Sequence, residues 1–222
     1  MSKIEAVLLD YGMVIGGNGP DQKDLAKILG IDVSLVEKAW DDIVPKFQIG
    51  AINEETFWLE FEKITGYRVD LRRSSPWLNG YRESGGRFEQ SRWLVESLND
   101  CVSRVGVLSN TIPPAAEYNR QAGNFSDFGI GTYITLSCEV GTKKPNQDIF
   151  EIAARKVGVP INKCLFVDDS QNYVSAARSA GMQAIQFKYD ALQAWPYMPL
   201  VKKLERSGIV LPNTNFVVNR YY

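Results

Sequence analysis

The sequence predicts an α/β protein in which a doubly wound parallel sheet carries an inserted all-helical segment. Two observations support this fold class. First, short apolar runs are each followed by a turn signal and a helical pattern, as expected for strands buried on both faces of a parallel sheet. Second, the long segment between the first two runs contains helical patterns but no strand-like alternation. The expected strands cover residues 6–9, 105–108, 133–136, 164–167 and 184–187.

The helices expected within the sheet region have clear end signals. After the third strand, a helical pattern begins near Asn146 and stops at Gly158, with Pro160 just beyond it. After the fourth strand, a second pattern runs from about Gln171 to Gly181. Glycine directly after a helix and proline soon afterwards are typical helix stops. Alternating strands and helices of this kind indicate a doubly wound α/β core.

The inserted segment is expected to span residues 17–86, which leaves residues 1–16 and 87–222 for the core. One helical pattern closes at Gly30, a second lies at residues 35–43, and a third starts at Asn53, a good N-cap residue. Its large aromatic residues are expected to form the insertion's own core, although one could line a substrate pocket. These residues are Trp40, Phe47, Phe57 and Trp58. Three arginines could bind an anionic substrate or form a solvated basic face: Arg68, Arg72 and Arg73.

Composition excludes several classes of function. The chain of 222 residues has 25 basic against 26 acidic side chains, so it lacks the basic excess of a nucleic-acid-binding protein. No apolar stretch reaches the roughly 20 residues of a membrane helix, and the first residues do not form a secretory signal. Three widely spaced cysteines suggest a reducing, cytoplasmic setting. Because histidine is absent, catalytic triads and imidazole zinc sites are impossible.

Polar side chains follow the expected strands at the edge where such sheets bind ligands. Asp10 follows the first strand, Ser109 and Asn110 the second, and Asp168 and Asp169 the fourth. Lys144 precedes Pro145 near the start of the helix after the third strand, although Lys143 is a rival for the same position. Taken singly, each residue could be a turn, a helix cap or a surface group. Together they place carboxylates, a hydroxyl and a lysine on one face.

These segments resemble the haloacid dehalogenase-like (HAD) hydrolase superfamily, in its phosphatase-like branch with a helical cap. The first motif is the strand that ends in Asp10, and the second is Val-Gly-Val-Leu-Ser-Asn at residues 105–110. The third is Gly-Thr-Lys-Lys-Pro at residues 141–145, and the fourth is Leu-Phe-Val-Asp-Asp-Ser at residues 165–170. All four occur in the family's order, and the helical insertion falls where the family places its first cap.

The resemblance implies an aspartyl-phosphate mechanism with Asp10 as the nucleophile. It implies a Mg²⁺ ion bound by Asp10, the carbonyl of Gly12 and Asp169, with Asp168 orienting Lys144 or a metal-bound water. Ser109, Asn110 and neighbouring N–H groups are expected to hold the phosphoryl oxygens, with Lys144 countering the developing charge. The expected ligand is a small phosphorylated metabolite, with neither nucleic acid nor membrane as a partner. The sequence indicates neither the identity of that metabolite nor an oligomeric state.

Two positions depart from the family pattern. Gly12 stands where many relatives carry a second aspartate that acts as the general acid and base. We therefore expect a phosphatase biased toward good leaving groups. Met13 stands where glycine or asparagine, which tolerate a left-handed backbone, is usual in the family. Either the loop differs locally here or the metal site fits imperfectly. The alternatives are a catalytically impaired HAD-like binding or regulatory protein and, less favoured because of Asp168 and Asp169, a 2-haloacid dehalogenase.

Overall fold

The computed structural model of the protein describes residues 3–72, 74–125 and 133–212. Its centre is a parallel five-stranded sheet in the order β3-β2-β1-β4-β5. The doubly wound parallel sheet predicted from the sequence is therefore confirmed, and each expected strand lies within one residue of its observed position at either end. The strands are β1 (Ala6–Leu9), β2 (Arg104–Ser109), β3 (Ile134–Leu136), β4 (Cys164–Asp168) and β5 (Gln183–Gln186).

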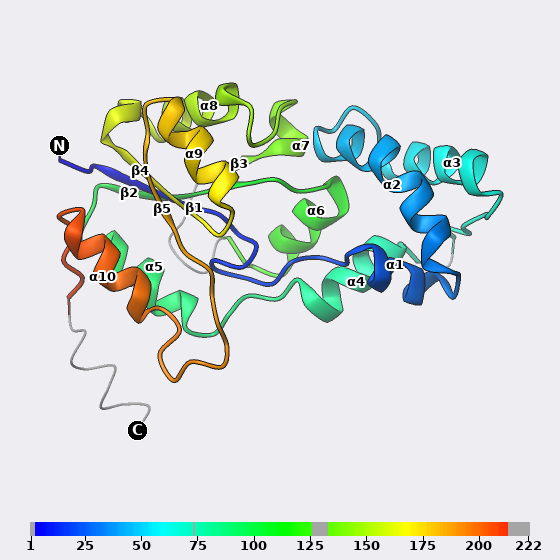
Figure 1. The fold of residues 1–222 in the computed structure, drawn as a ribbon, viewed down its shortest axis with the longest axis horizontal. Helices are drawn as coiled ribbons and strands as arrows, with labels where there is room; N and C mark the ends of the chain where they lie inside the picture. The colour runs from blue at the N-terminus through cyan, green and yellow to red at the C-terminus, as the bar shows by residue number, and fades with distance from the viewer. Residues whose placement is uncertain (1–2, 73, 126–132, 213–222) are drawn as a thin grey trace.

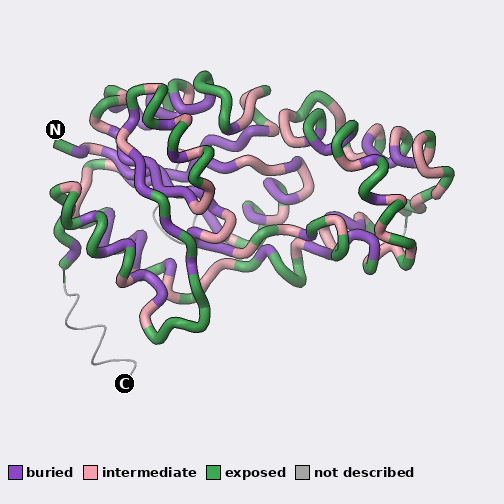
Figure 2. Tube along the Cα trace, viewed as in Figure 1, coloured by how far each residue is buried: buried purple, intermediate pink, exposed green. Residues whose placement is uncertain are grey.

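Helices cover both faces of this sheet (Figure 1). Alternate residues of β1 show why: Val7 and Leu9 enter one apolar cluster, whereas Ala6 and Leu8 enter another. The first cluster includes α5 (Ser91–Asn99) and α10 (Met198–Arg206), and the second includes α8 (Gln147–Val157) and α9 (Gln171–Ser179). A short 3₁₀ turn, Ile161–Lys163, leads into β4. The strands consequently form the most buried layer (Figure 2).

Four helices between β1 and β2 stand together beside the sheet (Figure 1). They are α1 (Gln22–Leu29), α2 (Val33–Gln48), α3 (Glu54–Thr65) and α4 (Pro76–Ser84). The sequence predicts the first three, and their ends follow its signals: Asn53 accepts the N–H of Thr56, and Gly30 closes α1 with φ 68°. The boundaries at residues 17 and 86 remain a prediction.

The four helices share an apolar core that continues onto the sheet region. Phe47, Phe57 and Trp77 pack against one another in this core, and Trp58 stacks against the same cluster. Ile112 and Ala115, at the start of α6 (Pro113–Gln121), belong to the same cluster. The helical layer is therefore packed directly onto an element that follows β2. None of the helices in the described ranges is long and apolar enough to cross a membrane.

Candidate active site

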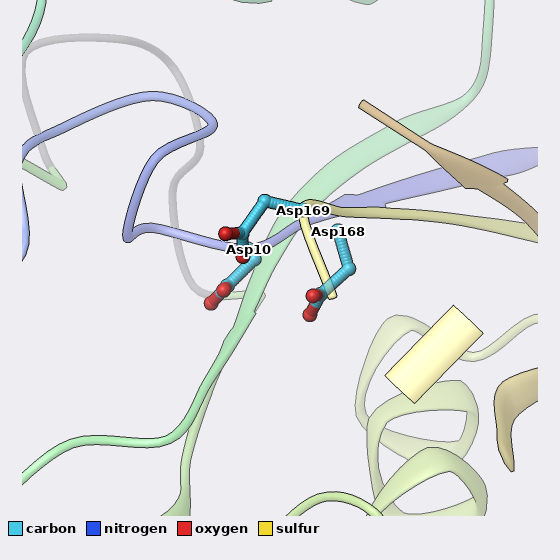
Figure 3. Close-up of side chains that lie close together, drawn as sticks. All are labelled: Asp10, Asp168 and Asp169. Carbon is cyan, nitrogen blue, oxygen red and sulfur yellow. The ribbon is translucent and has the colours of Figure 1, made fainter. Parts of the chain in front are cut away.

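The carboxyl ends of the central strands bring the predicted residues together. Leu9 pairs with Val107 on β2 and with Val167 on β4, so the chain leaves all three strands at nearly the same level. Asp10 follows β1, Ser109 ends β2, and Asp168 ends β4. Figure 3 shows the side chains of Asp10, Asp168 and Asp169 gathered at this edge. One carboxylate oxygen from each lies within 4.8 Å of the others.

Asp10 is held through one of its two carboxylate oxygens. Its Oδ1 accepts the backbone N–H of Tyr11 at 2.8 Å and lies 3.0 Å from Nζ of Lys144. Its Oδ2 has no such partner among the residues that the structure describes. The side chain is 11% exposed, so it is desolvated but reachable. The carboxylate is therefore fixed in orientation while one oxygen stays open for chemistry or for a cation.

Lys144 is the buried cation of the site. Its Nζ lies 2.6 Å from Oδ2 of Asp168 as well as 3.0 Å from Asp10, and it donates to the carbonyl of Leu108 at 3.3 Å. The ammonium also faces the rings of Phe166 and Tyr173, at 5.1 and 5.0 Å from their centres. Burial lowers the pKa of Lys144, but the two carboxylates more than offset that effect and the pKa is raised. The lysine is thus cationic at neutral pH.

Asp168 and Asp169 differ in how their carboxylates are used. Both oxygens of Asp168 are engaged, one by Lys144 and the other by the N–H of Ser170 at 2.8 Å. Burial, reinforced by Asp10, raises the pKa of Asp168 to about 6 against the lowering effect of Lys144. Burial and Asp10 also raise the pKa of Asp169, whose carboxylate accepts its own backbone N–H and no other donor among the described residues. An open oxygen on Asp10 and an open carboxylate on Asp169 form a donor set suited to a hard, oxygen-binding cation.

Asn110 positions Lys144 through its backbone. Its Oδ1 accepts the N–H of Lys144 at 2.8 Å, and its Nδ2 donates to the carbonyl of the same residue at 2.9 Å. The Asn110 side chain is thereby committed to the lysine. Lys143 points elsewhere, donating to Oε1 of Gln48 on α2 at 2.7 Å. Of the two rival lysines, only Lys144 joins the carboxylates.

The loop after Asp10 is a tight turn with one strained residue. The carbonyl of Tyr11 accepts the N–H groups of Ile15 and Gly16, and Met13 adopts the left-handed conformation, with φ 54°. The N–H of Met13 donates to the carbonyl of Gly16, and the carbonyl of Met13 accepts the N–H of Tyr189. Both polar groups of the Met13 backbone are therefore hydrogen-bonded. These bonds hold a conformation that costs a non-glycine residue roughly 1–2 kcal/mol. The carbonyl of Gly12 accepts none of these turn bonds, which leaves it open in the described chain.

A cavity of about 300 Å³ opens beside this edge of the sheet. Ser109, whose side chain is 5% exposed, lines it from β2. The helical layer contributes Trp40, Gln48 and Tyr81. Lysine and arginine are absent from the described lining, and its side chains are mostly aromatic or uncharged and polar. Trp40 therefore lines a pocket as well as packing against Trp77 at 5.9 Å.

The helical layer is tied to the sheet region next to this cavity. Ser137, which begins the short helix α7 (Ser137–Val140), donates to the carbonyl of Gln48 at 2.6 Å and accepts the N–H of Thr111 at 2.9 Å. Gly50 lies so near α7 that a Cβ there would come within 2.1 Å of the carbonyl of Cys138. The end of α2 and the segment after β2 therefore meet at one hydroxyl.

Sequence reasoning did not identify Asn18, Gln48, Tyr81 or Ser137 as site residues. None follows a predicted strand, so the strand-end criterion misses them. A signal existed for Asn18, which lies between Gly17 and Gly19 in the glycine-rich approach to the insertion. Of the three arginines considered for substrate binding, Arg72 is exposed and pairs with Asp70, and Arg73 lies outside the described residues.

Part of the chain is similar to a known family of hydrolases. Residues 94–181 match the model of the haloacid dehalogenase-like hydrolase family. The chain is 27% identical over 194 residues to the chloroplastic protein SUPPRESSOR OF QUENCHING 1 of Arabidopsis thaliana, covering 84% of this chain and 18% of the plant protein. It is 24% identical over 173 residues to a phosphatase of Mycobacterium tuberculosis, covering 73% of this chain and 76% of that protein.

A solved structure extends the likeness of fold to most of the chain. A HAD family enzyme of Bacteroides thetaiotaomicron, in complex with magnesium and inorganic phosphate, superposes with a TM-score of 0.71 at 21% identity. The match covers 88% of this chain and 98% of the bacterial one. The family match covers the region from β2 to α9, which carries three of the four motifs. The structural match extends beyond this region toward both ends of the chain. Residues 94–181 are therefore similar to the haloacid dehalogenase-like hydrolase family, and the chain as a whole has the fold of a HAD family enzyme.

Proposed function

We propose that the protein is a magnesium-dependent phosphohydrolase that acts on a small phosphorylated metabolite. The observation that carries this proposal is the grouping of Asp10, Asp168 and Asp169 around the buried ammonium of Lys144. A nucleophilic carboxylate, a place for a cation and a fixed positive charge then meet at one point. The proposal agrees with the named activity of the mycobacterial relative and with the ligands of the Bacteroides enzyme.

In this proposal one carboxylate oxygen of Asp10 attacks the phosphorus atom. A bond forms between that oxygen and phosphorus, the bond to the leaving oxygen breaks, and Asp10 becomes an aspartyl-phosphate. Water then attacks the same phosphorus, which releases inorganic phosphate and restores the carboxylate. The hydroxyl of Ser109 binds a phosphoryl oxygen, and Lys144 stabilises the charge that develops. The Asn110 amide keeps Lys144 in place during both steps.

The residues fit a Mg²⁺ ion held by Asp10, Asp169 and the carbonyl of Gly12, with Asp168 supporting Lys144. When bound, such an ion would neutralise charge between the carboxylates and the phosphoryl group. Asp168 is the least open of the three aspartates because Lys144 and Ser170 occupy both of its oxygens. We therefore assign its main part to orienting the lysine.

The leaving group decides which esters are good substrates. Gly12 supplies no acid, so the departing oxygen must take its proton from water. Loss of a general acid costs about 10²–10⁴ in rate, and it matters least for leaving groups that are stable as anions. Acyl, aryl and sugar-1-phosphates are consequently favoured. The cavity of about 300 Å³ and its mostly uncharged lining favour a small group without additional negative charge.

A series of aryl phosphates whose leaving groups differ in acidity tests this function. We expect hydrolysis that requires Mg²⁺, that is lost in Asp10→Asn, and that rises steeply with leaving-group acidity. Asp148→Asn, at an exposed carboxylate in the first turn of α8, is the matched control and should retain the wild-type rate. A flat dependence on leaving-group acidity with a rate-limiting chemical step would contradict the leaving-group argument.

The alternatives give different results in the same assay. Binding of phosphate with Mg²⁺ but no turnover across the series would favour a binding or regulatory protein. Chloride release from a 2-haloacid without metal would favour the dehalogenase. The three cysteines are all free, which suits the cytoplasmic location that we propose for this activity.

A further inference from the structure

The space beside Gly12 is filled by another residue. A Cβ atom built on Gly12 would lie 2.2 Å from Oδ1 and 3.4 Å from Cγ of Asn18. Contacts of a real Cβ essentially never fall below 3.0 Å. A side chain at residue 12 and the present position of Asn18 therefore exclude each other. The carboxamide oxygen of Asn18 thus occupies the space that the first carbon of a side chain at residue 12 would need.

Asn18 is held there by its glycine neighbours. A Cβ on Gly17 would come within 2.0 Å of the carbonyl of Ser84, and one on Gly19 would come within 2.0 Å of the Tyr81 ring. The N–H of Gly17 also donates to the carbonyl of Gly86 at 2.8 Å. Only a chain without side chains at residues 17 and 19 can lie this tightly against α4. The two glycines thus fix the backbone on both sides of Asn18.

The carboxamide of Asn18 is free to meet a ligand. It lines the cavity that contains Ser109 and also a second cavity of about 380 Å³ on the other side of the same linker. It is exposed, and the described residues offer it no hydrogen bond or ion pair. A buried structural asparagine would have such partners.

We propose that Asn18 replaces the missing acid at residue 12 as a hydrogen-bond donor to the leaving group. This inference rests on the proposed phosphohydrolase function. As the bond from phosphorus to the leaving oxygen breaks, the electron pair on that oxygen accepts an N–H of the carboxamide. The proton that completes the alcohol comes from water, because an amide does not release one at neutral pH. Asn18 consequently stabilises a departing anion without acting as an acid.

Thermal unfolding tests whether Asn18 occupies this place, whatever the activity. Gly12→Ala should lower Tm by a small amount, because the exposed carboxamide of Asn18 must move aside, and adding Asn18→Ala should restore Tm because that change removes both contacting atoms. Gly86→Ala is the matched control, since a Cβ there meets nothing within 4 Å. If Gly12→Ala costs no more than Gly86→Ala, or if Asn18→Ala does not relieve the loss, the steric relationship is wrong.

Kinetics with two esters test the chemical role. Asn18→Ala should lower kcat by about fivefold to tenfold for an alkyl phosphate, the value of one hydrogen bond, and by less for p-nitrophenyl phosphate. Asn18→Asp should raise the alkyl rate at acidic pH, and this gain should fall away as pH rises through about 4, where an exposed aspartate ionises. Equal effects on both esters would overturn the role of Asn18 while leaving the phosphatase intact. A wild type that hydrolyses neither ester, with Mg²⁺ present, would instead overturn the proposed function and this role with it.

Discussion

Replacing Lys144 with methionine should destabilise the protein in a strongly pH-dependent way. The change removes the ammonium that lies 3.0 Å from Asp10 and 2.6 Å from Asp168. At the 4.8 Å that bounds the separation of the carboxylate oxygens, two negative charges repel by about 3.5 kcal/mol with an effective dielectric constant of 20. This agrees with the roughly 3–5 kcal/mol that breaking a buried ion pair usually costs.

Protonation of Asp168 removes the repulsion between the two carboxylates and so limits the loss of stability in Lys144→Met. The free-energy cost of this protonation depends on pH. Its pKa is already raised from 3.8 to about 6 in the folded protein. A carboxyl with a raised folded pKa contributes stability that is fully present below 3.8 and lost as pH rises through about 6. Lys144 lowers the pKa of Asp168, so this pKa is higher in Lys144→Met. The stability lost as pH rises is then larger than in the wild type. Keeping Asp168 neutral costs about 4 kcal/mol at pH 7 but only about 2 kcal/mol at pH 5.

Urea-induced unfolding with a chelator present, at pH 7 and pH 5, measures this effect. We expect Lys144→Met to lower the free energy of unfolding by roughly 3–4 kcal/mol at pH 7, and by about half as much at pH 5. Lys143→Met is the matched control, because Lys143 donates to the neutral amide of Gln48 and its loss should cost about 1 kcal/mol or less at either pH. A loss for Lys144→Met that is equal at both pH values, or no greater than the control, refutes the reasoning.

Three further predictions concern individual contacts. Met13→Asn should raise the free energy of unfolding by up to about 1 kcal/mol in chemical denaturation, because asparagine tolerates a positive φ better than methionine. Asn110→Ala should lower kcat by at least about tenfold with little change in KM, as measured by steady-state kinetics, because Lys144 loses both backbone bonds. Ser137→Ala should speed protease cleavage of the helical layer and lower Tm, because the carbonyl of Gln48 loses its hydroxyl donor; unchanged cleavage would contradict this.

The sequence predicts the sheet well because its signals are local. Each strand is a short apolar run with polar residues directly after it, and parallel strands necessarily place those residues at one edge. The positions of Asp10, Ser109 and Asp168 follow from this rule. The sequence also predicts the end of α8 at Gly158, and this residue adopts φ 65° there. The proximity of Lys144 to two carboxylates agrees with the residues that the family resemblance selected.

The contacts that complete the site depend on the path of the linkers and could not be predicted. Asn18 meets Gly12 only because the chain folds back between α4 and the first strand. The helix α4 itself was missed, since Pro76, Asn79 and Gly80 interrupt its apolar pattern. The α10 helix was likewise not predicted, although its buried residues Leu200, Val201 and Leu204 have helical spacing. In these segments tertiary packing, rather than local propensity, determines the structure.

The single hydroxyl of Ser137 has a thermodynamic consequence for ligand binding. It bonds at once to the helical layer, through Gln48, and to the segment after β2, through Thr111. A substrate that displaces either segment must therefore change the equilibrium position of the other. Such coupling is reciprocal. If a ligand at the Ser109 end of the cavity shifts the equilibrium position of α2 by some factor, then fixing α2 in the favoured position changes the affinity for that ligand by the same factor. Ser137 therefore links ligand affinity at this cavity to the position of α2.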